Sequence, residues 1–253
     1  TRDANREESR KRINRWVEEI TREKIRDLIE PGVLDANTRM VLTNAMYFNG
    51  QWMWPFDKQL TSPSIFHVSS RESIMTDFMH LKKTLSFYED EEIQAIKLPY
   101  RNERISMTII LPRSVEGWEM ISRVLDHERL ATVESQFESA EVHVSLPKFK
   151  SELMLNLKNE LSAMGMSLAF SRDADLSGMS GEKNLFIDEV LHKAFIEVSE
   201  NGTEAAAATA AVIGLKSALR EEPARFNADH PFLYLIRDQQ TGCIIFIGRL
   251  VKP

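Results

Sequence analysis

The side chains that most often carry enzyme chemistry are scattered along this 253-residue chain. No histidine pair has the spacing of a helical metal site, and no glycine-rich loop could hold a phosphate. Residues 177–181 contain Gly-x-Ser but lack the second glycine of a nucleophile elbow, so a structural turn explains them better. The six histidines are His67, His80, His127, His143, His192 and His230. We therefore expect a protein that is not an enzyme and that needs neither a metal nor a cofactor.

A run of small side chains between Glu200 and Ser217 is the most unusual feature of the sequence. From Thr203 to Ala211, every side chain except that of Glu204 is Ala or Thr. Composition alone favours a helix or a linker, since Ala has the highest helix propensity. Read with a period of two, the run instead has one uncharged face, and Glu204 lies on the other. Such a strand, with small side chains and no proline, could enter between two existing strands and donate every ladder hydrogen bond.

Composition limits the class of partner. The net charge is −6, which argues against a nucleic-acid partner, and no apolar run approaches the length of a membrane span. A single cysteine, Cys243, excludes an internal disulfide, and its apolar neighbours predict a buried side chain. The length suits a single domain, 1–253.

Hydrophobic periodicity predicts a mixture of helices and strands. Helices are expected at 8–30, 117–137 and 152–164, and strands at 40–48, 84–88, 93–98, 105–111, 142–146 and 186–199. Residues 231–237 and 243–250 read as a hairpin around a turn that contains Gly242. The elements follow no regular strand–helix–strand alternation, and there are no repeats, so the fold class is α+β.

Several segments, in one order, resemble the serpin family of protease inhibitors. The resemblance begins at 5–17, in what would be helix F of that family, and covers the whole chain. The other segments are Asn-Ala-Met-Tyr-Phe-Asn-Gly-Gln-Trp at 44–52, Leu-Pro-Lys-Phe-Lys at 146–150, 174–179, 191–194, and Phe-Asn-Ala-Asp-His-Pro-Phe at 226–232. The resemblance implies the serpin fold, with three β-sheets and surrounding helices, of which the elements before helix F are missing from this chain.

The resemblance also implies a reactive-centre loop at about 200–225, whose first part is a hinge. The hinge residues that match inhibitory members are Glu200, Gly202, Thr203, Ala205, Ala206, Ala207, Ala208 and Thr209. In such members a serine protease cleaves the loop and is trapped as an acyl-enzyme while the loop inserts into the large sheet. The implied function is irreversible inhibition. The alternative is a non-inhibitory serpin that acts as a binder, carrier or chaperone.

The family spacing from the hinge glutamate places the cleaved bond at Lys216–Ser217. A lysine there favours trypsin-like proteases, whose specificity pocket is acidic. Arg220 is the competing position, and Lys216 is favoured over it. The ordinary alternative for Lys216 is an exposed loop lysine.

Four further positions resemble structural residues of the family. His192 and Asn44 match the shutter beneath the large sheet, where a hydrogen bond between them is expected. Trp52 matches the aromatic residue at the breach, where insertion begins, and Lys148 with Glu200 matches a hinge ion pair. As ordinary alternatives, His192 is a core histidine whose hydrogen bonds are satisfied, and Glu200 and Lys148 form an exposed ion pair that adds little stability.

The missing elements admit two explanations. The N-terminal part is either removed or present as a separate chain, which would then be a partner, or the chain is a truncation that neither folds properly nor inhibits. A glycosaminoglycan is left open as a second partner, and an extracellular location is expected.

Overall fold

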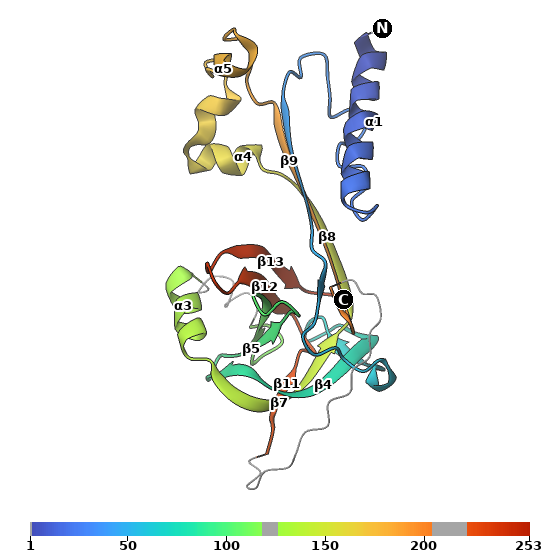
Figure 1. Ribbon diagram of the computed structural model, residues 1–253, viewed down its shortest axis with the longest axis vertical. Coiled ribbons are helices and arrows are strands. Elements are labelled where there is room, and N and C mark those ends of the chain that lie inside the picture. The colour runs from blue at the N-terminus through green and yellow to red at the C-terminus, as the bar shows by residue number, and fades with distance from the viewer. Residues whose placement is uncertain (1, 118–125, 204–221) are drawn as a thin grey trace. The chain divides into compact units, whose positions relative to one another are not determined.

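The computed structural model describes residues 2–117, 126–203 and 222–253 (Figure 1). The chain divides into two compact units, Thr1–Phe48 with Ser151–Ile196 and Asn49–Lys150 with Glu197–Pro253. Both contain helices and strands, which confirms the α+β class. The single-domain assignment stays a prediction. In the described part of the chain, no helix is both long and apolar enough to cross a membrane.

The first unit is built on a parallel strand pair covered by a helix. Its elements are α1 (Arg2–Ile20), β1 (Val41–Tyr47), most of β8 (Phe149–Asn156), α4 (Lys158–Leu161), the π-helical turn η2 (Ser162–Met166), η3 (Ser167–Phe170), α5 (Ser177–Ser180) and most of β9 (Glu189–Ser199). β1 pairs with β9 from Val41↔Glu189 to Tyr47↔Phe195. The core consists of Val17, Ile25, Leu28, Ile29 and Leu191, all buried.

The helix predicted at 8–30 is shorter than its apolar pattern indicates. It ends at Ile20, and Arg22, Glu23 and Asp27 have φ angles of 53°, 61° and 48°, which no α-helix contains. The chain turns back so that Ile29 lies against α1, where its backbone N–H and C=O bond the Asn14 amide at 2.9 Å each. Ile25, Leu28 and Ile29 are buried because they pack on the helix, not because they extend it.

The helix predicted at 152–164 is wrong over its first half. Residues Phe149–Asn156 form strand β8, which pairs with β9, and helical structure begins only at Lys158. Leu153 and Met164, two apolar residues of the predicted helix, are 52% and 80% exposed. Pairing with a neighbouring strand outweighs helix propensity here. The chain turns at Gly165, whose φ is 102°.

The second unit is built on an eight-stranded sheet with the order β11-β7-β4-β5-β6-β12-β13, and β3 also pairs with β4. Its elements are β2 (Gly50–Gln51), η1 (Lys58–Leu60), β3 (Ser62–His67), β4 (Ser73–Glu89), β5 (Ile93–Pro99), β6 (Ile105–Pro112), α3 (His127–Ser135), β7 (Glu138–Pro147), β10 (Gly202–Thr203), β11 (Ala224–Asn227), β12 (Phe232–Asp238) and β13 (Ile244–Leu250). The hairpin of β12 and β13 confirms its prediction.

Two further expectations, a buried Cys243 and a helix at 117–137, have separate outcomes. Cys243, predicted to be buried, is exposed, because it lies in the turn just before β13. Of the helix predicted at 117–137, the structure has α3, whose N-terminus is capped by Asp126. Residues 118–125 lie outside the described part of the chain.

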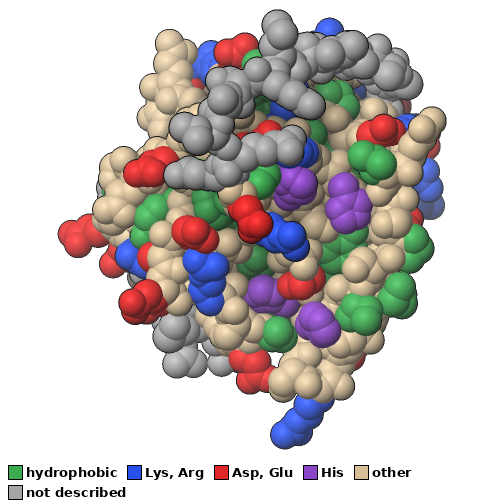
Figure 2. Space-filling model, turned by 90° about the horizontal axis from the view of Figure 1, so that it is seen from below, with side chains coloured by type: hydrophobic (Ala, Val, Ile, Leu, Met, Phe, Trp, Pro, Cys, Tyr) green, Lys and Arg blue, Asp and Glu red, His purple; other side chains and the backbone are tan. Residues whose placement is uncertain are grey.

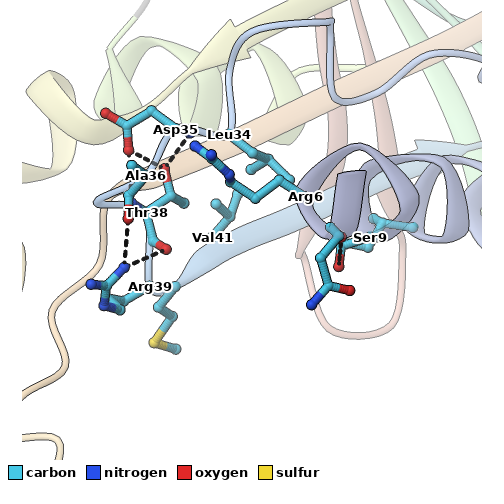
Figure 3. A pocket seen from close by; sticks show the side chains of 11 residues that line it. Arg6, Ser9, Leu34, Asp35, Ala36, Thr38, Arg39 and Val41 are labelled. Carbon is cyan, nitrogen blue, oxygen red and sulfur yellow. Dashed lines mark hydrogen bonds between the residues drawn. The ribbon is translucent and has the colours of Figure 1, made fainter. Parts of the chain in front are cut away.

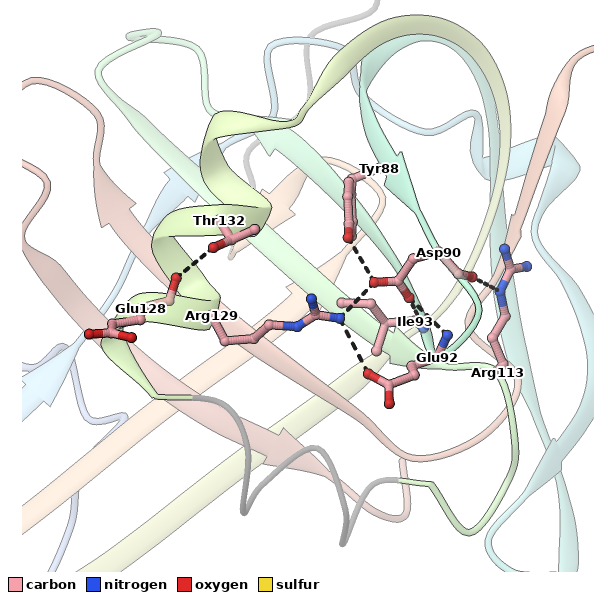
Figure 4. Close-up of polar contacts among 8 residues, drawn as sticks. All are labelled: Tyr88, Asp90, Glu92, Ile93, Arg113, Glu128, Arg129 and Thr132. Atoms are coloured by element: carbon pink, nitrogen blue, oxygen red, sulfur yellow. Dashed lines mark hydrogen bonds and ion pairs between the residues drawn. The ribbon is translucent and has the colours of Figure 1, made fainter.

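The turn between β4 and β5 is fixed to α3 by a polar network (Figure 4). The carboxylate of Asp90 accepts hydrogen bonds from Tyr88 Oη at 2.7 Å and from Arg129 at 2.6 Å. Burial alone would raise the pKa of Asp90, but these bonds and two from backbone N–H groups lower it. The acidic turn 89–92 thus has a structural role. On its other side, Glu89 forms an ion pair with Arg113.

Candidate functional site

The start of the small-residue stretch already forms a strand. Gly202 and Thr203 constitute β10, which pairs antiparallel with β2 through Gly202↔Gln51 and Thr203↔Gly50. On its other side β10 pairs antiparallel with β9, where Thr203 lies opposite Val198. Two residues of the predicted hinge therefore lie between two strands of a sheet. This is the arrangement expected of a segment of small side chains that enters a sheet as a new strand.

Thr203 is anchored by its hydroxyl. Its side chain has no exposed surface, and its Oγ1 lies 2.9 Å from Oη of Tyr100, which is also buried. Tyr100 stacks on Trp52 with ring centroids 4.5 Å apart, and Nε1 of Trp52 donates to the carbonyl of Ser199 at 2.9 Å. Trp52, predicted to lie where insertion begins, thus contacts the backbone immediately before β10.

Gly202 is required by its backbone conformation and its surroundings. Its φ is +136°, in the region that side chains rarely adopt. A Cβ at this position would lie 2.1 Å from the carbonyl oxygen of Gly50, an atom of the backbone that cannot move aside. Only glycine lets β2 and β10 approach this closely.

Glu200 is a buried carboxylate with two side-chain partners. It is 5% exposed, and its Oε1 lies 3.1 Å from Nζ of Lys148 and 3.0 Å from Oγ1 of Thr61, which donates to it. Burial alone would raise the pKa of Glu200, but hydrogen bonds from its own backbone N–H, Lys148 and Thr61 outweigh burial and lower it. The Lys148–Glu200 pair has the geometry expected of the hinge ion pair, with Glu200 held as an anion.

The structure brings His192 and Asn44 together in the first unit. They are register partners on β9 and β1, and Nδ1 of His192 lies 3.0 Å from Oδ1 of Asn44. The expected hydrogen bond is present on a half-buried imidazole. Its role as a shutter stays a prediction.

Sequence reasoning missed Tyr100 and Thr61. Tyr100 follows Pro99 at the end of a strand, and Thr61 follows η1, so neither belongs to a motif. Each is more than 100 residues from its partner, at separations of 103 and 139. The remaining predicted residues lie outside the described part of the chain: Ala205, Ala206, Ala207, Ala208, Thr209, Lys216, Ser217 and Arg220.

A pocket in the first unit offers no chemistry of its own. It has a volume of about 540 Å³ and lies between α1 and the segment 34–41 (Figure 3). Its one carboxylate, Asp35, accepts the hydroxyl of Thr38 at 2.9 Å and two backbone N–H groups, and these bonds lower its pKa. Across the described residues, no group of three or more His, Cys, Asp or Glu side chains could hold a metal ion.

Comparison with known proteins identifies the family. Residues 2–253 match the serpin family model, described as serine protease inhibitor. The chain is 42% identical over 254 residues to the leukocyte elastase inhibitor of Xenopus laevis, covering 98% of this chain and 67% of that protein. It is 43% identical over 249 residues to Serpin B10 of Papio anubis, covering 96% and 62% respectively.

Solved structures agree with the family match. Uncleaved ovalbumin superimposes with a TM-score of 0.86 at 32% identity, over 98% of this chain and 63% of that structure. Serpin48 of the insect Tenebrio molitor gives 0.84 at 36% identity, over 98% and 65%. The chain thus spans about two thirds or slightly less of the length of these relatives. It belongs to the serpins, a family of protease inhibitors and not of enzymes.

Proposed function

We propose that the protein carrying this chain is an irreversible inhibitor of trypsin-like serine proteases, which traps the protease by inserting its cleaved loop as a strand. The observation that carries the proposal is β10, since Gly202 and Thr203 already lie between β2 and β9. After Glu204, which lies on the other face of the run, residues 205–209 are all Ala or Thr. Small side chains without proline suit continued pairing along β9.

The proposed specificity rests on Lys216. A lysine at the cleaved bond would enter the acidic pocket of a trypsin-like protease. One relative is named for leukocyte elastase, so elastase belongs in the same experiment as a second protease. Secretion stays part of the proposal, and its measurement is whether the protein accumulates in the medium of cells that express it.

The test mixes the full-length protein with trypsin and separately with elastase, followed by denaturing gel electrophoresis. We expect a covalent complex with trypsin, and a released C-terminal peptide whose first residue is Ser217. Lys216→Ala should abolish the trypsin complex, whereas Arg220→Ala, which removes the same charge four residues later, should keep it. A released peptide that begins at Glu221 would show that the protease cleaves after Arg220 instead of Lys216.

Cleavage of the loop without any covalent complex would refute the inhibitory proposal. That result would favour the alternative, a serpin that binds, carries or chaperones another molecule. Thermal unfolding after cleavage separates the two cases further. Insertion of the cleaved loop adds a hydrogen-bonded strand and should raise the melting temperature, while a loop that stays outside the sheet should not change it.

A further inference from the structure

Three adjacent strands of the second unit place a row of basic and polar side chains on one face of the sheet. In the register of β4, β7 and β11, Lys82 lies opposite His143, and His143 lies beside Arg225. The neighbouring row consists of His80, Ser145 and Asn227. Paired residues on neighbouring strands point to the same face, so these six side chains share it.

The other face of these strands belongs to the core. Val142, Val144 and Phe226, which alternate with the polar residues, are at most 2% exposed. The side chains of Lys82, His143, Arg225 and Asn227 are exposed, and those of His80 and Ser145 are half-buried. Because side chains alternate between the two faces of a strand, these six side chains point towards solvent while their neighbours point into the core.

These six residues line a hollow of about 550 Å³, and Leu60 contributes to its wall. Figure 2 views the molecule from below and shows histidine side chains (purple) gathered on one face among charged side chains of both signs. The face is concave, so several side chains can reach one bound group at the same time.

The groups in the hollow are mostly hydrogen-bond donors that the described residues leave unused. Lys82 has one counter-charge, Glu141, at 3.3 Å. Among the described residues, none forms a hydrogen bond or ion pair with the guanidinium of Arg225, with the imidazoles of His80 and His143, or with the hydroxyl of Ser145.

We propose that this hollow binds a tetrahedral oxyanion, a phosphate or sulfate group. A guanidinium presents two parallel N–H donors that match two oxygens of such a group, and imidazole N–H and hydroxyl groups add further donors. A metal ion fits less well, because the described residues offer two imidazoles here but no third ligand. The site is separate from β10, and its test does not depend on protease inhibition.

The test is a titration of the full-length protein followed through the imidazole proton resonances in NMR spectra. His80→Gln and His143→Gln assign the two resonances. Inorganic phosphate, inorganic sulfate and a sulfated oligosaccharide are added separately at constant ionic strength, with chloride as the reference anion. We expect saturable shifts of both resonances with an oxyanion and none with chloride.

Arg225→Ala should weaken this binding about fivefold to tenfold, since it removes a charged donor pair. Arg225→Lys keeps the charge and should lose less. The matched control is Arg172→Ala, which removes the same charge from an exposed turn of the first unit and should leave the affinity unchanged.

Saturation by phosphate or sulfate alone supports a site for the free ion, and saturation only by the oligosaccharide supports a site for a sulfated polymer. Equal losses in Arg225→Ala and Arg172→Ala would overturn the proposal, because net charge would then explain the binding. Shifts of the same size with chloride as with the oxyanions would overturn it as well. Unchanged melting temperatures show that the variants are folded.

Discussion

The buried hydrogen bond between Tyr100 and Thr203 allows a quantitative test of how the start of the loop is held in the sheet. The two hydroxyl oxygens lie 2.9 Å apart, and the side chains are 2% and 0% exposed. Burial raises the pKa of Tyr100, so its phenol is protonated at neutral pH and able to donate. A neutral bond of this kind contributes about 1 kcal/mol, and a buried hydroxyl left without a partner costs about 1–3 kcal/mol.

Thr203→Val keeps the branched shape and removes the hydroxyl, so it should destabilise the protein by about 1–2 kcal/mol. Tyr100→Phe should cost a similar amount. In the double variant both ends of the bond are removed, so the loss should fall short of the sum of the single losses by about 1 kcal/mol.

The measurement is urea unfolding of the full-length protein, followed by tryptophan fluorescence, for the four members of this double-mutant cycle. Losses that add within about 0.3 kcal/mol would show that the two hydroxyls do not interact and would refute the reasoning. The same variants, tested for complex formation with trypsin, would show whether a weaker anchor changes the fraction of cleavage events that end in a trapped protease.

Two further predictions concern neighbouring residues. Gly202→Ala should cost at least about 3 kcal/mol, since it adds a backbone clash to an unfavourable φ, while Gly178→Ala, which has no atom within 4 Å of the new Cβ, should change the melting temperature little. Lys148→Met removes the counter-charge of Glu200; because the Lys148 side chain is 38% exposed, we expect a loss of only about 1 kcal/mol at pH 7. The folded-state pKa of Glu200 is lowered, so the stabilisation is present above the ordinary glutamate pKa and is lost as pH falls through the folded value. Urea midpoints of wild type and Lys148→Met should therefore converge in acid; a difference that persists there would contradict this assignment.

Local patterns in the sequence predicted four strands of the second unit well, namely β5, β6, β12 and β13, whereas β3 and β11 were not predicted and β4 and β7 are longer than predicted. The turn residues at 238–242 and the apolar runs on either side of them indicate a hairpin, because the hydrogen bonds of a hairpin join residues that are close in sequence. β5 and β6 follow the same rule across the turn at 100–104. In each case the pattern and the pairing partner lie within one short segment.

Strand β8 shows where local patterns fail. Leu153 and Leu157 have helical spacing, yet β8 is extended because β9 supplies its hydrogen bonds, and the backbone N–H of Leu157 itself donates to Val190 at 2.8 Å. The partner is more than thirty residues away in sequence and leaves no mark on the residues of β8. Cys243 shows the same limit, since apolar neighbours did not reveal that it lies in a turn at the surface.

The candidate site contains features that a local pattern predicted and contacts that only residues far apart in sequence provide. The period of two in the small-residue stretch predicted that a strand could form there, and Thr203 is indeed buried between strands. The resemblance to serpins supplied Lys148 as a partner for Glu200, but nothing local indicated Tyr100 or Thr61. Their contribution depends on the three-dimensional approach of segments far apart in sequence, which a single sequence does not encode in any short motif.

Within four residues, the hinge is held by three kinds of interaction: an ion pair at Glu200, close backbone contact at Gly202 and a buried hydrogen bond at Thr203. Further insertion along β9, as proposed, meets a different obstacle, because β9 is paired with β1 over seven residue pairs, including Asn44↔His192. An entering strand must break those bonds, each worth about 0.5–1.5 kcal/mol net, and replaces them with bonds on both of its own sides. The exchange therefore favours insertion once begun, while the β1–β9 pairing resists its start.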